Sequence, residues 1–429
     1  MKIVETKNKQ FEKIFENLIS SKRSQSISKL KLVNQIIKNI KKKGDVALFN
    51  YTKKFDKLSI NKKNIKITNK ESSKLIRNLD KNVKKAIDVA YQRIYQFHKN
   101  QVSSGFKFND KKGNQLSYKF RSLKSVGIYV PGGTASYPST LLMNAIPAIV
   151  ANVKNIYAVI PCPNGKINAG VLYAAKKCKI KSIFRVGGAQ AVAALAYGTE
   201  SIPRVDKIVG PGNIYVATAK KELFGSVGID MVAGPSEITV IADNSCNPEW
   251  TAIDLLSQAE HDVLSQSILI TKDKNFGRKV KSKVNLLLKS LPRNKIASKS
   301  IKNYGAIIVV RNNKEIIDIV DRIAPEHLEI KVNNPEAIEK RISNAGSVFL
   351  GKYSPEAIGD YIAGPNHVLP TSGSARFSSG LSVADFYKKT SVIKCSKSGI
   401  EKIGQLAINL AEYEGLYAHA LSVRKRLGD

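Results

Sequence analysis

The chain of 429 residues lacks any apolar segment long enough to cross a bilayer. A membrane-spanning helix needs about 18 or more consecutive apolar residues, and no run in this sequence reaches that length. The first residues, MKIVETKNKQFEKIFENL, are polar and amphipathic, and they lack the apolar centre and small-residue cleavage site of a secretion signal. The sequence therefore predicts a cytoplasmic protein that has no membrane partner.

Cysteine is also scarce, with four in the whole chain at Cys162, Cys178, Cys246 and Cys395. Their wide spacing contains no CxxC pair, which argues against a zinc ribbon and against a disulfide framework. We expect reduced thiols in a reducing compartment.

Acidic residues are outnumbered, and the formal net charge is +36. Such an excess raises the possibility of nucleic-acid binding. However, the excess is mostly lysine scattered through helical patterns such as 29–45 and 277–290, and arginine, the side chain suited to bidentate base contacts, is scarce by comparison. No zinc finger, RNP motif or basic zipper is present. We therefore expect no specific nucleic-acid partner and attribute the charge to a general lysine bias.

What the sequence does contain is a regular alternation of strand and helix patterns. Strand-like runs separated by helical segments imply parallel βαβ units. The same rhythm resumes after residue 248, without a sequence repeat between the halves. The sequence predicts an α/β fold with two Rossmann-like, doubly wound, mostly parallel sheet domains, a helical N-terminal arm and a helical C-terminal extension. The strand-like runs cover 125–130, 155–161, 182–187, 205–210, 237–243, 265–273 and 305–310.

The dinucleotide fingerprint GxGxxG is absent. Three glycine turns nevertheless follow three successive strands, at 131–133, 187–189 and 210–212. In a parallel sheet these turns share the carboxyl edge, where glycine lets the backbone approach a phosphate. A dinucleotide site is one interpretation. A turn that needs glycine for its own geometry is the other, and the loops alone do not distinguish them.

Histidine occurs only five times, so each position is informative. We interpret His98, on a lysine-rich helix, as structural. His261 ends a helix that Asn247 can cap, and at 3.6 residues per turn it shares one stripe with Asp254 and Gln258. A Gln-x-x-His pair can present an amide oxygen and an imidazole to one metal ion. A capped core helix that ends in polar residues explains the same pattern.

Two further segments combine histidine with carboxylates. Asp360 and His367 lie either side of a Gly-Pro turn, which can be functional or merely a turn. Near the C-terminus, a straight helix would align Glu412 with His419, whereas an interruption at Gly415 would favour Glu414; spacing alone does not choose between them. Gln, His, Asp and His side chains together would form a mixed nitrogen and oxygen set suited to Zn²⁺.

The segment RIAPEHLEI, 322–330, sets Glu326 beside His327. Neighbouring side chains usually diverge, so the pair is either an ordinary turn or a carboxylate and an imidazole placed for proton transfer. Imidazole suits proton abstraction because its unperturbed pKa is about 6.5.

Eight ordered motifs resemble the histidinol dehydrogenase family. The resemblance spans roughly residues 120–429 and continues more loosely through the N-terminal part. It implies oxidation of L-histidinol to L-histidine with two NAD⁺ and one water. The motifs are VGIYVPGGTASYPSTLLMNAIPA, GGAQAVAALAYGTE, VGPGNIYVATAK, AGPSEITVIAD, DLLSQAEHD, APEHLEI, GDYIAGPNHVLPTSGSARFSSGLSV and EGLYAH.

The resemblance also implies residue roles. One Zn²⁺ per subunit would be held by Gln258, His261, Asp360 and His419. His327 would be the main general base, with Glu326 beside it. NAD would contact Tyr129, Gln190 and Asn213. The substrate L-histidinol would contact Ser236, Gln258, His261, His327, Asp360, His367, Glu414 and His419, so Glu414 is preferred over Glu412. The family forms homodimers with shared active sites, in which Glu414 and His419 would act on the partner's site.

We expect a discontinuous organisation on this basis. Residues 1–25 would form the arm, 26–128 with 239–380 the metal-binding and catalytic domain, 129–238 the NAD-binding domain, and 381–429 an extension exchanged in the dimer. Two alternatives stay open: a zinc- and NAD-dependent dehydrogenase of another amino alcohol, and a basic nucleic-acid-binding α/β protein.

Overall fold

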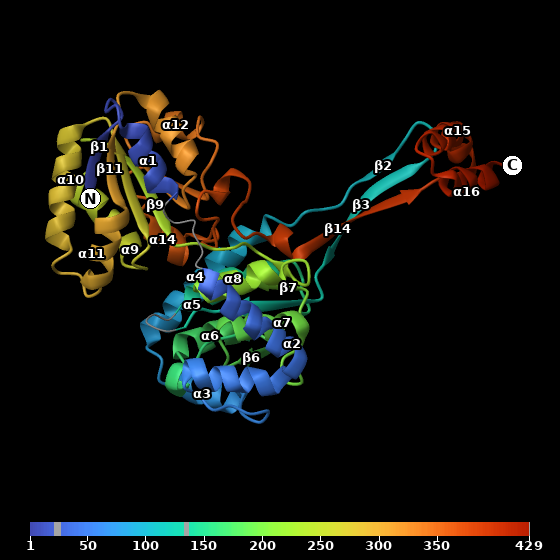
Figure 1. Ribbon diagram of the computed structural model, residues 1–429, viewed down its shortest axis with the longest axis horizontal. Coiled ribbons are helices and arrows are strands. Elements are labelled where there is room, and N and C mark those ends of the chain that lie inside the picture. The colour runs from blue at the N-terminus through green and yellow to red at the C-terminus, as the bar shows by residue number, and fades with distance from the viewer. Residues whose placement is uncertain (21–26, 133–136, 429) are drawn as a thin grey trace.

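A computed structural model of the chain describes residues 1–20, 27–132 and 137–428 (Figure 1). Two parallel sheets, each covered by helices, lie one above the other in this view, and a narrow arm carries the C-terminus away from both.

The larger sheet has six parallel strands in the order β1-β11-β10-β9-β12-β13. Its central strands are buried on both faces, as expected of a parallel sheet with helices on each side. The register pairs His327 with Ile238 and Ser347, so His327 lies at the amino end of its strand. The strands are β1 Lys2–Glu5, β9 Glu237–Ala242, β10 Gln266–Thr271, β11 Gly305–Val309, β12 His327–Lys331 and β13 Ser347–Leu350.

Helices cover both faces of this sheet because its apolar residues alternate between them. Val240 packs into the core under α9, α10 and α11, whereas Ile241 packs into the core under α1 and α12. The helices are α9 Pro248–Ala259, α10 Lys274–Leu287, α11 Asn294–Tyr304, α1 Phe11–Ser20, α12 Asn313–Ile323 and the short α13 Pro335–Glu339.

The smaller sheet has five parallel strands in the order β6-β5-β4-β7-β8. Two apolar cores cover its faces, one with α4, α5 and α6, the other with α2, α7 and α8. The strands are β4 Ser125–Tyr129, β5 Asn155–Val159, β6 Ser182–Phe184, β7 Lys207–Val209 and β8 Gly228–Ile229. The helices are α2 Ile27–Asp56, α3 Asn69–Arg77, α4 Lys81–Lys99, α5 Pro138–Val150, α6 Ala169–Lys177, α7 Gly188–Tyr197 and α8 Ile214–Leu223.

The predicted pair of doubly wound sheets is confirmed. Several details differ from expectation. The helices between residues 27 and 99 pack on the five-stranded sheet and not on the six-stranded one, because an amphipathic helix carries no signal for which sheet it covers. Lys2–Glu5 adds an edge strand to the arm expected as helical, whose residues 21–25 lie outside the described ones. The domain boundaries themselves stay a prediction.

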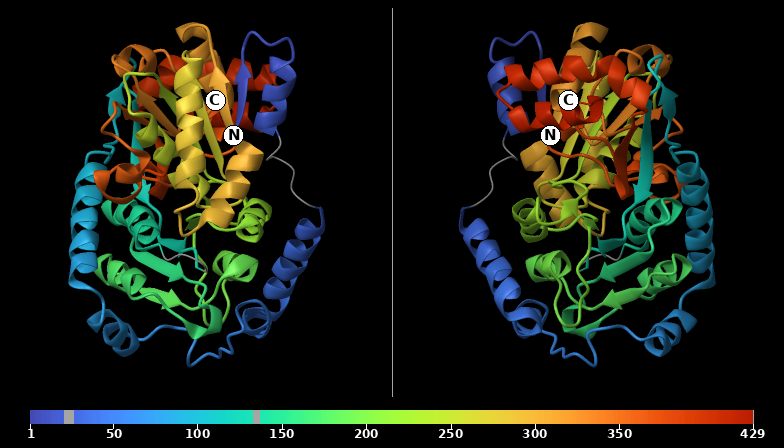
Figure 2. Two further views of the ribbon diagram at one scale, coloured as in Figure 1. Left: turned by 90° about the vertical axis from the view of Figure 1, so that its left-hand side faces the viewer. Right: turned by 90° about the vertical axis from the view of Figure 1, so that its right-hand side faces the viewer.

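An antiparallel sheet of three strands forms the arm (Figures 1 and 2). It joins β2 Lys107–Asn109, β3 Gln115–Ser122 and β14 Tyr387–Lys394, and it ends in the paired helices α15 Lys397–Tyr413 and α16 Tyr417–Leu427. The extension expected as helical thus begins with a strand. The remaining short helices are α14 Glu356–Ile358, η1 Pro163–Gly165, η2 Gly359–Ala363, η3 Ser374–Arg376 and η4 Val383–Phe386. Among the described residues, no helix combines the length and apolar character needed to cross a bilayer.

Candidate active site

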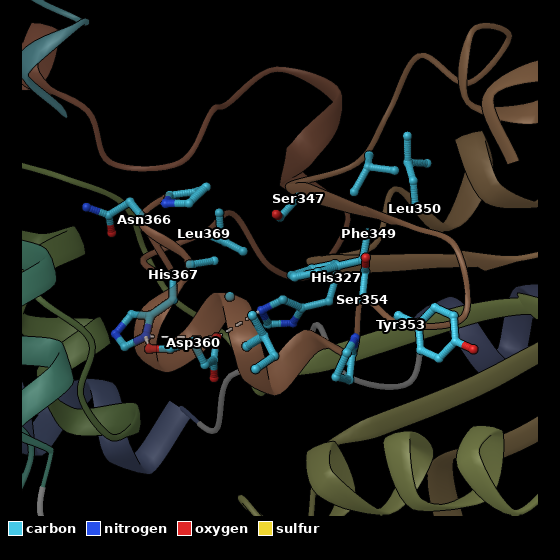
Figure 3. Close-up of a pocket in the computed structure, with 16 residues that line it drawn as sticks. His327, Ser347, Phe349, Leu350, Tyr353, Ser354, Asp360, Asn366, His367 and Leu369 are labelled. Carbon is cyan, nitrogen blue, oxygen red and sulfur yellow. Dashed lines mark hydrogen bonds and ion pairs between the residues drawn. The ribbon is translucent and has the colours of Figure 1, made fainter. Parts of the chain in front are cut away.

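His327 opens onto a cavity of about 390 Å³ at the amino edge of the six-stranded sheet (Figure 3). The ring is buried, and its Nδ1 lies 3.0 Å from the carbonyl oxygen of Glu237 on the neighbouring strand β9. A histidine that donates one ring N–H to a backbone carbonyl keeps the other nitrogen as an acceptor. The contact therefore leaves Nε2 as the nitrogen available for chemistry in the cavity.

Three carboxylates surround this imidazole. Nε2 lies 3.7 Å from Asp360 Oδ1 and 3.8 Å from Glu356 Oε1, and Nδ1 lies 3.8 Å from Glu326 Oε2. His327, Glu356 and Asp360 each offer one ligand atom, and these atoms all lie within 4.8 Å of one another. Figure 3 shows His327 and Asp360 facing each other across the cavity, with His367 beyond. The arrangement brings three possible ligand atoms together at one point, where a metal ion can bind.

The protonation of the site reflects this crowding. Burial opposes a charge on His327, but the carboxylates of Glu326, Asp360 and Glu356 outweigh it and raise the pKa of His327 to about 10. Burial raises the pKa of Glu326 to about 7, although His327 opposes the shift. Burial and the neighbouring Asp360 raise the pKa of Glu356 to about 8. Burial would also raise the pKa of Asp360, yet the hydrogen bond with His327 holds it well below its usual range.

Glu326 follows the turn that closes α12. Ala324 adopts the left-handed conformation with φ 47°, which reverses the chain before β12. The carboxylate Oε2 of Glu326 accepts a hydrogen bond of 2.8 Å from the backbone N–H of Glu237. Glu326 and His327 are thus both tied to the same residue of β9, and their side chains are held beside each other despite being neighbours in the chain.

Gln258 lies in the last turn of α9, whereas His261 lies in the turn after the helix ends at Ala259, so the stripe predicted for one helix reaches Gln258 but not His261. The helix begins at Pro248, and the Asn247 side chain accepts the N–H of Glu249, as the sequence predicts. The Gln258 side chain is fully buried, and within the part of the chain that the structure describes neither its oxygen nor its nitrogen has a hydrogen-bond partner. An unpartnered buried amide is costly, so a ligand that satisfies its oxygen fits here.

His261 is close enough to the cavity for Asp360 and His327 to influence its titration. Although the residue is exposed at the surface, the surrounding protein desolvates the ring and lowers the pKa of His261, which favours the neutral form that can bind a metal. An amide oxygen, a neutral imidazole and an ionised carboxylate are donor types that zinc accepts, so Gln258, His261 and Asp360 stay candidates for its ligands.

His367 lies on the turn after η2. Its Nδ1 lies 2.8 Å from the Asp360 carbonyl oxygen, and its Nε2 lies 3.4 Å from the Thr140 hydroxyl on α5. It thus connects the cavity to a helix of the five-stranded sheet. Ser236 lies just before β9, and its carbonyl accepts the Gln266 N–H at 3.0 Å.

Glu414 and His419 lie elsewhere. Both are exposed on the paired helices at the end of the arm, away from the cavity of the same chain (Figure 1). Glu412 forms an ion pair with Arg424, whereas Glu414 ends α15 immediately before Gly415, whose φ is 71°. A single chain therefore does not bring His419 to Gln258, His261 and Asp360.

The glycine turns lie at the carboxyl edge of the five-stranded sheet. The hydroxyl of Tyr129, at the end of β4, accepts the N–H of Gly188 at 3.0 Å. Gly188 has φ 66°, and a Cβ there would meet the Gln190 amide oxygen at 2.7 Å. This turn therefore requires glycine for its own geometry. Asn213 caps α8 by accepting the N–H groups of the two residues that follow Ile214. Gly133, in the first turn, lies outside the described residues.

Sequence reasoning missed Glu356. The nine residues from Pro355 to Ala363 show no clear period, so nothing in the sequence placed this carboxylate opposite His327. It also missed Lys331, because a histidine, glutamate and lysine at alternate positions of a strand are typical of an exposed face. The structure buries all three.

Comparisons with known proteins agree with this geometry. A family model described as histidinol dehydrogenase matches residues 20–427. The chain is 52% identical to a histidinol dehydrogenase of Pelagibacter ubique over 428 residues, which cover 100% of this chain and 99% of the relative. It is 50% identical to one of Hydrogenovibrio crunogenus, covering 93% and 92%.

Solved structures give the same result. A crystal structure of histidinol dehydrogenase from Elizabethkingia anophelis matches with a TM-score of 0.93 and 40% identity, covering 100% of this chain and 98% of that one. An acetylating aldehyde dehydrogenase from Geobacillus thermoglucosidasius, at TM-score 0.50 and 13% identity, covers 87% and 98% and shares the fold alone. The chain therefore belongs to the histidinol dehydrogenase family, whose members use zinc and NAD to oxidise L-histidinol to L-histidine.

Proposed function

We propose that His327 is the general base of this oxidation. The observation that carries the proposal is the contact between Nδ1 and the Glu237 carbonyl, which turns Nε2 toward the cavity. Removal of hydride from the carbinol carbon leaves a proton on the hydroxyl oxygen, and Nε2 is placed to accept it. Each oxidation of the substrate releases a proton, so the same atom serves in both.

Glu326 would take part in the proton transfers of the second oxidation. The second oxidation starts from an aldehyde, which must gain oxygen from water before it can lose another hydride. Glu326 has a pKa of about 7, so its carboxylate can take a proton from water and return it to solvent. Cys178 and Cys162 do not offer a route through a thioester, since burial raises the pKa of both thiols far from neutrality.

Gln258, His261 and Asp360 would hold the zinc ion, with His419 of the partner subunit as the fourth ligand. When bound, zinc would hold the substrate's nitrogen atoms and disfavour a proton on His327, and NAD would accept the hydrides. Tyr129, Gln190 and Asn213 would contact NAD. The substrate would lie between Ser236, His327, His367 and Glu414 of the partner subunit.

A homodimer accounts for the arm. The arm projects from the molecule, and its terminal helices expose Leu406, Leu410, Tyr413, Tyr417 and Leu421. Apolar surface of this kind is stabilised by burial against another chain. Docking on a second copy would bring Glu414 and His419 toward the partner's cavity. We also propose a cytoplasmic location, which suits four cysteines that form no disulfide.

The test is formation of NADH from L-histidinol by the purified protein, with and without a zinc chelator. We expect two NADH per histidine formed and loss of activity after chelation. One NADH per substrate, or activity that survives complete removal of zinc, would contradict the proposal. A panel of other amino alcohols separates the remaining alternative, because a dehydrogenase specific for another substrate would oxidise that one faster.

A further inference from the structure

A buried lysine lies directly behind the proposed metal site. Lys331 is at the carboxyl end of β12, and its side chain is 1% exposed. Within its strand, Leu328 and Ile330 pack into the core on the α12 side. His327, Glu329 and Lys331 therefore point to the opposite face, toward α9.

The ammonium of Lys331 is shared between two carboxylates on different elements. It forms an ion pair with Asp254 on α9, and it lies 2.9 Å from Glu329 Oε2 on its own strand. Asp254 is one turn before Gln258 on the same stripe of α9. The ion pair therefore fixes the position of α9 along the length of β12. It thereby also fixes where Gln258 and His261 lie relative to His327.

A second connection runs from Glu329 to the other side of the site. Glu329 Oε1 accepts the backbone N–H of Glu356 at 2.7 Å. Glu356 starts the short helix that continues into η2, which carries Asp360. The Ser257 hydroxyl on α9 donates to Glu356 Oε2 at 3.3 Å and closes the loop between the two elements.

Stability alone does not explain this network. Buried ion pairs are costly to desolvate, and replacing them by well-packed apolar residues is often neutral or stabilising. Many residues on this face of the six-stranded sheet are apolar, among them Ile238, Val240 and Ala242, so apolar packing is available here. An ion pair does, however, fix the relative position of two elements more specifically than an apolar contact.

We propose that Lys331 is a positioning residue of the active site, a single ammonium that sets α9 and the Glu356–Asp360 segment against β12. The inference rests on the proposed ligands Gln258 and His261. Its consequence is that zinc affinity depends on Lys331 and Asp254, although neither touches the metal. Outer-shell partners of metal ligands commonly change affinity by about 10–100-fold.

The test measures zinc affinity by competition with a chelator, alongside the melting temperature, for Lys331→Met and Asp254→Leu. Lys220→Met is the matched control, because Lys220 forms a buried ion pair with Asp230 in the other sheet. We expect zinc affinity to fall about 10–100-fold in both test variants. The control should lower the melting temperature and leave zinc affinity within about twofold of the native value.

Zinc affinity within twofold of the native protein in either folded test variant would overturn the proposal. So would failure of both variants to fold, because the network would then serve the whole fold and not the site. His261→Ala is measured in parallel to separate the two hypotheses: full zinc binding in that variant would refute the ligand assignment, whatever Lys331→Met shows.

Discussion

At the scale of single residues, the hydrogen bonds that a side chain already makes decide which of its atoms can act on a substrate. His327 uses Nδ1 for the Glu237 carbonyl, so its catalytic capacity lies in Nε2 alone. His327→Ala should lower kcat by about 10²- to 10⁴-fold, the usual contribution of a general base. Zinc content, measured by metal analysis of the same sample, should stay near the native level because His327 is not among the proposed ligands. Loss of zinc in this variant would refute the assignment of His327 as a base.

Replacing Gln258 should affect the stability of the metal-free protein and its affinity for zinc in opposite directions. Among the described residues, the buried Gln258 amide has no hydrogen-bond partner in the metal-free protein. Gln258→Leu removes that amide while keeping similar volume, so the metal-free variant should be as stable as the native protein or more stable, by up to about 1–3 kcal/mol. Zinc affinity should fall at the same time.

The measurement for Gln258→Leu is urea unfolding of the chelator-treated proteins, together with chelator competition for zinc. Asn144 offers a comparison, because it also has a buried oxygen without a partner, but its amide nitrogen donates to the Thr140 carbonyl. Asn144→Leu should therefore destabilise the protein and leave zinc affinity unchanged. A strongly destabilised metal-free Gln258→Leu would show that the amide is satisfied without metal.

At the scale of elements, α4 supports the loop that carries His367. His98, on α4, is buried, with Nδ1 2.9 Å from the Ile94 carbonyl oxygen and Nε2 3.3 Å from the Asn366 amide nitrogen. Nε2 therefore accepts the Asn366 N–H and the ring is neutral. The sequence interpretation of His98 as a structural residue agrees with these contacts.

This arrangement predicts a loss of stability in mild acid. Burial lowers the pKa of His98, so the unfolded chain, with a histidine pKa of about 6.5, binds its proton more readily than the folded one. The contribution of neutral His98 to stability is present above the pKa of histidine in the unfolded chain, and it is lost as the pH falls below that pKa. The free energy of unfolding should decrease between pH 7.5 and 5.5, and less so in His98→Gln. Identical pH dependence of the two proteins in urea titrations would contradict this.

The strands also show which parts of the fold can be predicted from the sequence and which cannot. The strand Glu237–Ala242 was predictable because a short run rich in β-branched residues lies between a Gly-Pro pair and a segment rich in Asp and Asn. The edge strand Lys2–Glu5 was not, because four residues show no period. The charged residues of β12 were hidden for a different reason. Polar residues at alternate positions of a strand normally indicate that one face is exposed to solvent. Here the Lys331 ammonium is instead paired with Asp254, 77 positions earlier, and a single sequence does not reveal that pairing.

At the scale of the whole molecule, the glycine turns and His327, the proposed general base, belong to different sheets. The turns follow strands of the five-stranded sheet at its carboxyl edge, whereas His327 begins a strand of the six-stranded sheet. His367 reaches between them through Thr140. The motifs that resemble the family supplied these candidate residues, whereas no feature of the sequence indicated that His327 and the glycine turns would lie on different sheets.

The position of the arm makes the shared site testable. Glu326 lies beside His327, which lines the cavity, whereas His419 is exposed on α16 at the end of the arm. In a dimer with exchanged arms, mixing Glu326→Ala and His419→Ala subunits gives heterodimers in which one site has both defects and the other is intact. Random pairing makes half of the dimers mixed, so activity should recover to about a quarter of the native value.

The measurement is NADH formation after the two inactive variants are unfolded together and refolded. The control is each variant refolded alone, which should stay inactive. A second control mixes Glu326→Ala with His327→Ala. Both residues lie in the part of the site that comes from the same chain, so every site in a mixed dimer keeps one defect and no activity should return. Recovery in that mixture would reveal an artefact, and no recovery with His419→Ala would mean that each chain completes its own site, in conflict with the distance between arm and cavity in one chain.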